Sequence, residues 1–169
     1  MSLDGYIAGP NEEIDWIVVD PDHDFGAFLA RFDTALMGRK CYDFMRRHHG
    51  SAAMPGLEMH VISRTLRQAE CPDATVSADP GATVAALKAR QGKDIWCFGG
   101  GELFRSLLAL GLVETVELAV IPVLLGGGLP LLPPPSPSAK LTLTQQRLFP
   151  KTGTVLLEYA VNNPGSFPS

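Results

Sequence analysis

The chain has 169 residues, of which 46% are hydrophobic and 19% are charged, a composition typical of a folded domain with one substantial core. Its formal net charge of −4 argues against a broad nucleic-acid-binding face, and its apolar runs are too interrupted to span a bilayer. The start of the chain lacks the pattern of a signal peptide, so we predict a cytoplasmic protein. The cysteines and histidines lack the spacing of metal ligands, so no metal site is expected.

Short strands alternate with amphipathic helices through the first two-thirds of the sequence. The chain opens with Asp4-Gly5, a turn-forming pair, directly before an apolar strand. In this part the expected strands cover residues 4–8, 34–38, 59–63, 74–78 and 94–98, and the expected helices cover 24–32, 38–48, 81–91 and 101–111. Such an alternation is typical of a parallel or mixed sheet covered by helices.

The last third contains only strands, expected at residues 113–123, 140–149 and 154–161. The last two form a predicted hairpin whose turn is "PKTG". The proline-rich stretch 129–140 is expected to be a surface loop, and residues 162–169 a flexible tail. We therefore predict a single α/β domain over residues 1–161, with a mixed, mostly parallel sheet and an antiparallel C-terminal hairpin.

The most informative turn follows the strand expected at 94–98. Gly99, Gly100 and Gly101 come next, and a helix begins at once. Three glycines let the backbone approach a ligand closely, and the helix N-terminus favours an anion, so this turn indicates phosphate binding. The alternative is a sharp turn that only needs a flexible backbone.

Two other predicted strands also end in residues suited to anions. Gly38 is followed by Arg39 and Lys40 in the first turn of a helix, where cations oppose the helix dipole unless an anion binds there. The alternative is that both are solvated surface charges. The strand expected at 59–63 ends in a turn that carries two hydroxyls and a guanidinium, from Ser63, Arg64 and Thr65. By themselves these residues are common in loops that bind nothing.

All three turns stand at the carboxyl ends of predicted strands, where open α/β sheets bind their ligands. Several such turns at one edge suit a dinucleotide with its pyrophosphate and a ribose phosphate. The sequence therefore predicts a dinucleotide site at this edge.

Taken in order, "SLDGYIA", "DTALMGRKCYD", "VISRTL", "DIWCFGGGELFRSLLALGLVETVELAVIPVLLGGGLPL" and the closing hairpin resemble the dihydrofolate reductase superfamily. Within it, the chain is similar over nearly its whole length to the reductase domain of the bifunctional riboflavin-biosynthesis deaminase-reductase. The resemblance implies a three-layer α/β/α fold with one mixed sheet, NADPH as the hydride donor, and a homodimer that pairs through late strands. The apolar stretch at 115–125 would suit such pairing, or alternatively a buried central position.

Roles for individual residues follow from the same resemblance. It implies that the cofactor phosphates contact Gly38, Arg39 and Lys40, and that the adenosine 2′-phosphate contacts Ser63, Arg64 and Thr65. It implies that the pyrophosphate contacts Gly99, Gly100, Gly101, Glu102 and Leu103. It also implies that the nicotinamide contacts Ile7 and Ala8. Asp24, four residues before Phe28, matches the acid that grips the pterin in dihydrofolate reductases. An acid that merely caps the following helix is the alternative, and Asp22 is a nearby alternative for the role.

The resemblance also has departures. The "PW" dipeptide of the pterin-binding pattern is absent, so reduction of a heterocycle other than dihydrofolate is favoured. In this family "SLDG" follows a central strand, so we expect most of that strand to be missing here and Met1 to be an internal methionine of a longer natural product. We therefore expect an NADPH-dependent oxidoreductase acting on a small, flat, pterin- or pyrimidine-like compound, with Asp24 as its catalytic acid. The rival interpretation is a cofactor-binding domain without turnover.

Overall fold

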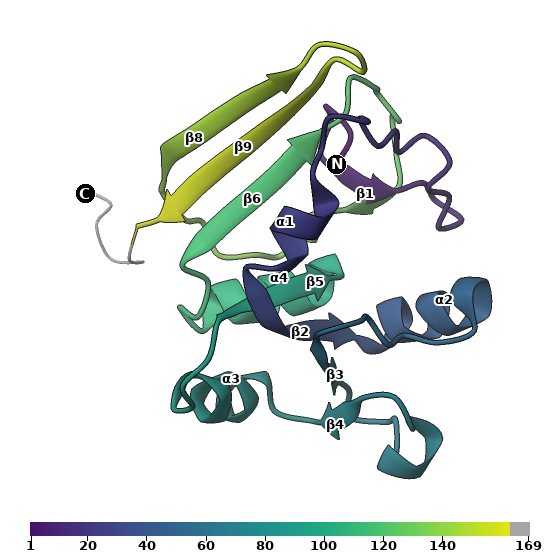
Figure 1. Ribbon diagram of the computed structural model, residues 1–169, viewed down its shortest axis with the longest axis vertical. Helices are drawn as coiled ribbons and strands as arrows, with labels where there is room; N and C mark the ends of the chain where they lie inside the picture. Colours follow the sequence, from purple (N-terminus) through teal and green to yellow (C-terminus); the bar gives the residue numbers. More distant parts are fainter. Residues whose placement is uncertain (163–169) are drawn as a thin grey trace. The chain divides into compact units, whose positions relative to one another are not determined.

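The computed structural model describes residues 1–162, which form two compact units (Figure 1). One unit comprises residues 25–106 and the other comprises residues 1–24 and 107–162. The elements in chain order are β1 (Tyr6–Ala8), α1 (Phe25–Leu29), β2 (Phe32–Gly38), α2 (Arg39–His49), β3 (Glu58–Ile62), the 3-10 turn η1 (Gln68–Glu70), β4 (Thr75–Ser77), α3 (Pro80–Lys88), β5 (Asp94–Gly99), α4 (Gly101–Ala109), β6 (Thr115–Val120), β7 (Leu129–Pro130), β8 (Leu141–Phe149) and β9 (Thr154–Val161).

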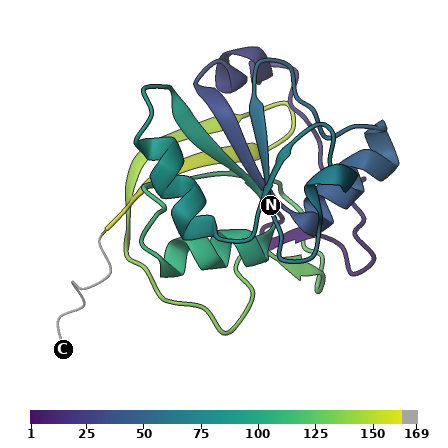
Figure 2. The same ribbon diagram turned by 90° about the horizontal axis from the view of Figure 1, so that it is seen from below.

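The unit of residues 25–106 is built on a four-stranded parallel sheet in the order β4-β3-β2-β5. The chain leaves β2 through α2 toward β3 on one side, and returns from β4 through α3 to β5 on the other side. Because parallel crossovers are right-handed, these two opposite directions place α2 and α3 on opposite faces of the sheet. Figure 2 shows this separation, with α2 and α3 on either side of the strands. The predicted α/β/α layering is therefore confirmed for this unit.

The core of this unit lies between the sheet and α2. Ala35, Met37 and Val61 are fully buried on the strand face beneath the helix, and the Tyr42 ring of α2 packs against them. Alternate residues of a strand point to one face, so this apolar set requires the strands to keep the register that places it under α2. The core therefore fixes the register of β2 and β3, and with it the positions of their carboxyl ends.

The second unit contains an antiparallel sheet in the order β6-β9-β8, together with the short antiparallel pair β1 and β7. The predicted hairpin is confirmed: β8 and β9 are joined by residues 150–153, where Gly153 has a φ of +72° and its N–H donates to the Phe149 carbonyl. The predicted turn at Asp4-Gly5 is also confirmed, since Gly5 has a φ of +92° and its N–H donates to the carbonyl of Ser2.

The structure differs from the sequence-based expectations in three elements. The first helix is only Phe25–Leu29, because Phe32 already belongs to β2. The third helix begins at Pro80, capped by Asp79, and ends at Lys88 rather than near Gly92. The expected loop at 129–140 begins with a strand, β7, which was missed because two residues carry no readable periodicity.

The described strands form hydrogen-bonded sheets of four, three and two strands, and they combine parallel pairing with an antiparallel C-terminal hairpin as expected. The single domain expected over residues 1–161 stays a prediction. Nearly all of the expected flexible tail, residues 163–169, lies outside the described residues. Among the helices described, none has the length and apolar character that crossing a membrane requires.

Candidate functional site

The three turns singled out in the sequence lie at one edge of the parallel sheet. β2, β3 and β5 run in the same direction, and the register pairs Gly38 with Ile62 on one side and Met37 with Gly99 on the other. The turns that begin at Gly38, Ser63 and Gly99 are therefore neighbours. All three turns follow the carboxyl ends of parallel strands, which is the edge where open α/β sheets bind their ligands.

The turns after β2 and β5 touch each other. A Cβ placed on Gly38 would lie 3.9 Å from both the Gly100 nitrogen and the Gly99 oxygen. Gly99 itself has a φ of +122°, a conformation that L side chains rarely adopt. The two glycine turns thus bring backbone close to backbone at this edge, beside the Cβ of Leu103.

Helix α4 begins directly at the glycine turn. Its first residue, Gly101, is buried, and the Leu103 side chain is 6% exposed, so this end of the helix is firmly packed. Glu102 points away into an ion pair with Arg105. The first N–H groups of a helix have no partner within it, so this end offers backbone donors to an anion.

Helix α2 begins at Gly38 with an unusual arrangement of charge. No side chain caps the helix and its first turn contains no acid, while Arg39 and Lys40 bring two cations to the positive end of the helix dipole. Both side chains are exposed. Such an end is electrostatically suited to an anionic ligand.

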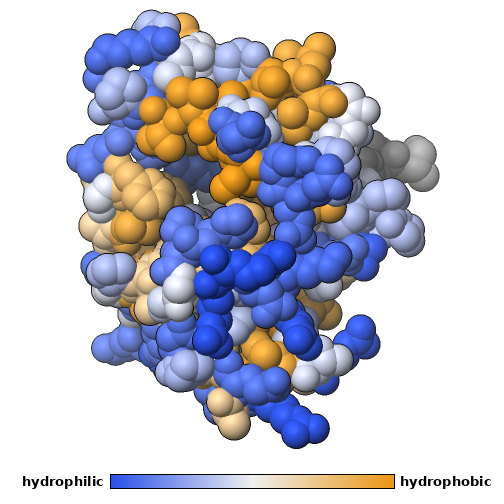
Figure 3. Space-filling model, turned by 90° about the vertical axis from the view of Figure 1, so that its right-hand side faces the viewer, coloured by the Kyte–Doolittle hydropathy of each residue, from blue (hydrophilic) through white to orange (hydrophobic). Residues whose placement is uncertain are grey.

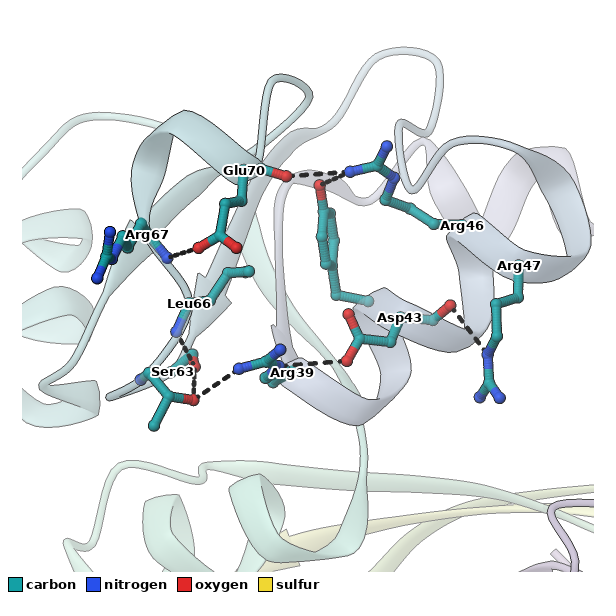
Figure 4. Close-up of polar contacts among 10 residues, drawn as sticks. Arg39, Asp43, Arg46, Arg47, Ser63, Leu66, Arg67 and Glu70 are labelled. Atoms are coloured by element: carbon teal, nitrogen blue, oxygen red, sulfur yellow. Dashed lines mark hydrogen bonds and ion pairs between the residues drawn. The ribbon is translucent and has the colours of Figure 1, made fainter.

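The turn after β3 is ordered around one hydroxyl group. Ser63 Oγ accepts hydrogen bonds from the backbone N–H groups of Thr65 at 3.2 Å and Leu66 at 3.0 Å. Thr65 Oγ1 in turn accepts a 2.8 Å hydrogen bond from Arg39 Nη1, so α2 and this turn are linked directly (Figure 4). Arg64 is exposed beside them.

A polar cluster around the buried Tyr42 joins α2 to the segment that follows β3, and no local pattern in the sequence indicates it. The Tyr42 hydroxyl donates to Asp73 Oδ1 at 2.8 Å, and Arg46 Nη1 donates to the Glu70 carbonyl at 3.0 Å. Burial raises the pKa of the Asp73 carboxyl, but the N–H of Ala52 and nearby hydroxyls outweigh this and hold the pKa below its usual value. The cluster joins residues far apart in sequence, so only the folded chain reveals it.

Ile7 and Ala8 belong to the other unit, where β1 pairs with β7. Before them, Asp4 accepts hydrogen bonds from Ser2 Oγ at 2.6 Å and from the Gly126 N–H at 2.7 Å. The Ser2 hydroxyl and this N–H hold the pKa of Asp4 below its usual value. The sequence identified Asp4 only as a turn residue, whereas the structure shows that it also ties the turn to the loop before β7.

The two candidate acids lie just before α1. Asp24 is exposed and precedes the first helical residue, Phe25. Asp22 forms a 2.7 Å ion pair with Lys151. A substrate role for Asp24 stays a prediction.

Within residues 1–162, no three His, Cys, Asp or Glu side chains are grouped so as to hold a metal ion. Burial raises the pKa of the Cys97 thiol to about 12, so this thiol is protonated and a poor nucleophile at neutral pH.

Together these features define an α/β protein whose parallel sheet ends in an anion-receptive edge. The family model described as "RibD C-terminal domain" matches residues 1–155, and the chain belongs to this family. This result confirms the resemblance found in the sequence.

The relatives and solved structures agree with this assignment. The uncharacterized protein YyaP of Bacillus subtilis is 34% identical over 96% of this chain and 92% of its own length. A putative riboflavin biosynthesis protein from Shewanella shares the fold with a TM-score of 0.81 at 23% identity, covering 96% of both chains. A pyrimidine reductase-like protein from Corynebacterium diphtheriae has a TM-score of 0.67 at 18% identity, covering 97% of this chain and 90% of its own.

A third solved structure is a bifunctional protein. It is a diaminohydroxyphosphoribosylaminopyrimidine deaminase and 5-amino-6-(5-phosphoribosylamino)uracil reductase from Thermotoga maritima, with a TM-score of 0.67 at 16% identity. The match covers 95% of this chain and 54% of that one. The expected α/β fold class is therefore confirmed.

Proposed function

We propose that this protein is an NADPH-dependent oxidoreductase that reduces a small, flat, pterin- or pyrimidine-like heterocycle. The observation that carries the proposal is the convergence of three anion-receptive turns on one edge of the parallel sheet. Membership of the RibD C-terminal domain family and the reductase names of fold neighbours support the same class of reaction. NADPH, when bound, would supply the hydride.

The residues present at the edge fit the phosphates of such a cofactor. Gly38, Gly99 and Gly100 place backbone without side chains at this edge, and the N-termini of α2 and α4 add N–H donors. Arg39, with Thr65 and Ser63, provides a guanidinium and hydroxyls suited to a ribose phosphate. Lys40 and Arg64 add positive charge, while Glu102 and Leu103 shape the start of α4.

In the other unit, we propose that Ile7 and Ala8 contact the nicotinamide and that Asp24 orients the substrate or biases its protonation. Asp24 lies in an exposed position directly before the first residue of α1. No nucleophile is required, because hydride transfer depends on distance, orientation and the exclusion of water.

The proposal is tested by calorimetric titration with NADPH and by following NADPH oxidation with a panel of pterins, pyrimidinones and quinone-like compounds. We expect NADPH to bind and at least one heterocycle to oxidise it, and we expect D24N to lower turnover while NADPH still binds. Absence of NADPH binding at millimolar concentration would remove the proposal. Binding without oxidation by any compound would favour the alternative, a cofactor-binding domain without turnover.

We also propose that the protein forms a homodimer through the sheet β6-β9-β8. Within the described residues, β8 pairs only with β9, so its outer edge is unpaired. The register places Leu141, Leu143 and Leu148 on one face of β8, and they are 43%, 48% and 60% exposed. A long, exposed, apolar edge strand is a common site of association between copies.

Sedimentation analysis of the wild type and of an L143E/L148E variant tests the dimer. We expect a dimer for the wild type and a monomer with an unchanged circular dichroism spectrum for the variant; a monomeric wild type would contradict the proposal. The strand β6, which the sequence favoured for this contact, lies at the opposite edge of the same sheet.

The cytoplasmic location also remains a prediction.

A further inference from the structure

The guanidinium of Arg39 is held from two sides. Its Nε donates to Asp43 Oδ2 at 3.3 Å, one helical turn along α2. Its Nη1 donates to Thr65 Oγ1 at 2.8 Å in the turn after β3 (Figure 4). The Nη2 group makes no hydrogen bond within the described residues, so its two N–H donors are left to an incoming acceptor.

The partners of Arg39 are themselves fixed. Thr65 lies in the turn that Ser63 Oγ orders through two backbone N–H groups. At its other end, α2 is attached to the same segment by Arg46, which donates to the Glu70 carbonyl. The orientation of Arg39 is therefore set by a rigid frame, in which Asp43 supplies the contact to Nε.

Local stability does not account for the Asp43 contact. The two side chains are 46% and 45% exposed, and an exposed ion pair of this kind adds little to folding. Arg39 also stands at the helix end where a cation is unfavourable. Figure 3 shows that hydrophilic residues predominate at the centre of the surface seen in that view. The contact of Asp43 with Arg39 gains a purpose if an anion binds at Arg39.

We propose that Asp43 is a positioning residue that selects a cofactor with a 2′-phosphate. By holding Nε, it keeps Arg39 in the rotamer that brings Nη1 to Thr65 in the turn after β3, so a long side chain is already ordered before the cofactor binds. The carboxylate also repels the phosphate, but solvent and salt screen this repulsion at an exposed site. Orientation therefore outweighs repulsion, and NADPH is favoured over NADH. This inference rests on the proposed function.

Two variants separate the hydrogen bond of Asp43 from its charge. D43A removes both, whereas D43N keeps an oxygen that can accept from Arg39 Nε. Calorimetry with NADPH and with NADH gives the readout, and thermal unfolding shows whether either variant alters the fold. R39A serves as the reference for complete loss of the guanidinium.

We expect D43A to weaken NADPH binding about two- to tenfold, the range for ordering one long side chain, and to leave NADH binding unchanged. We expect D43N to bind NADPH within about twofold of the wild type. Wild-type affinity for NADPH in D43A, equal losses for both cofactors, or a D43N variant as weak as D43A would each overturn the role of Asp43. If the wild type binds neither cofactor, both the proposed function and this inference fail. If R39A loses NADPH affinity and D43A does not, only the role of Asp43 is overturned.

Discussion

Three consecutive glycines in the loop before β7 have three different environments, which makes alanine substitution a sharp test of the packing of β1. Gly128 has a φ of +145°, and a Cβ there would overlap the carbonyl oxygen of Ala8 and lie 3.2 Å from the carbonyl carbon of that residue. Gly126 has a φ of +70° with open space around the added atom. Gly127 has open space and no such restriction on φ.

The expected cost of each substitution follows from these environments. At Gly128, a strained backbone conformation costs about 1–3 kcal/mol, and forcing a methyl group against the backbone of β1 adds about 1–3 kcal/mol. G128A should therefore lower the free energy of unfolding by about 2–6 kcal/mol. G126A should cost about 1 kcal/mol through its left-handed conformation, and G127A should stay within about 0.5 kcal/mol of the wild type.

Urea denaturation followed by circular dichroism measures these differences, and thermal unfolding provides an independent check. A chain of this size loses about 2–4 °C in Tm per kcal/mol, so G128A should melt on the order of 10 °C below the wild type. G126A and G127A are the matched controls, since they lie in the same loop. Equal stability of G128A and G127A would refute the close approach of Gly128 to Ala8.

Two further predictions concern the unit of residues 25–106. Hydrogen bonds from Arg90 and His60 lower the pKa of Glu58 from 4.5 to about 2, so its stabilising effect is complete above pH 4.5 and is lost as the pH falls toward 2. Because the Glu58 side chain is 43% exposed, solvent screening limits this effect to about 0.5–1 kcal/mol. In urea denaturation at neutral pH, E58Q should be less stable than the wild type by that amount. A stability difference that persists unchanged at a pH of about 2 would contradict this role of Glu58. Y42F should lower the free energy of unfolding by about 1.5–3 kcal/mol, because the buried hydroxyl donates to the Asp73 carboxylate; a variant as stable as the wild type in the same assay would show that this hydrogen bond contributes nothing.

The parallel sheet could be predicted from the sequence because its signals are local. Apolar runs such as the one in β2, followed by glycine and an amphipathic helix, mark where a strand ends and a helix begins. Once those elements are parallel neighbours, their carboxyl ends must lie at one edge. The grouping of the turns at Gly38, Ser63 and Gly99 therefore followed from element order alone.

The errors occurred where local signals are weak or are overridden by packing. β7 has only two residues and exists because it pairs with β1, so no periodicity could reveal it. The first helix is short because Phe32, which fits a helical pattern, is buried as the first residue of β2 beside Asp94. In both cases a partner distant in sequence decided the conformation.

The sequence by itself determined the α/β class, the order of the elements and the edge at which glycine, hydroxyl and guanidinium groups gather, because each depends on spacing within a few residues. Only the tertiary structure decided how those groups are held. The contact of Arg39 with Thr65 spans 26 positions, that of Tyr42 with Asp73 spans 31, and that of Asp4 with Gly126 spans 122. Hydrogen bonds between segments so far apart leave no periodic trace in a sequence, since they depend on where the packed core brings each strand to an end.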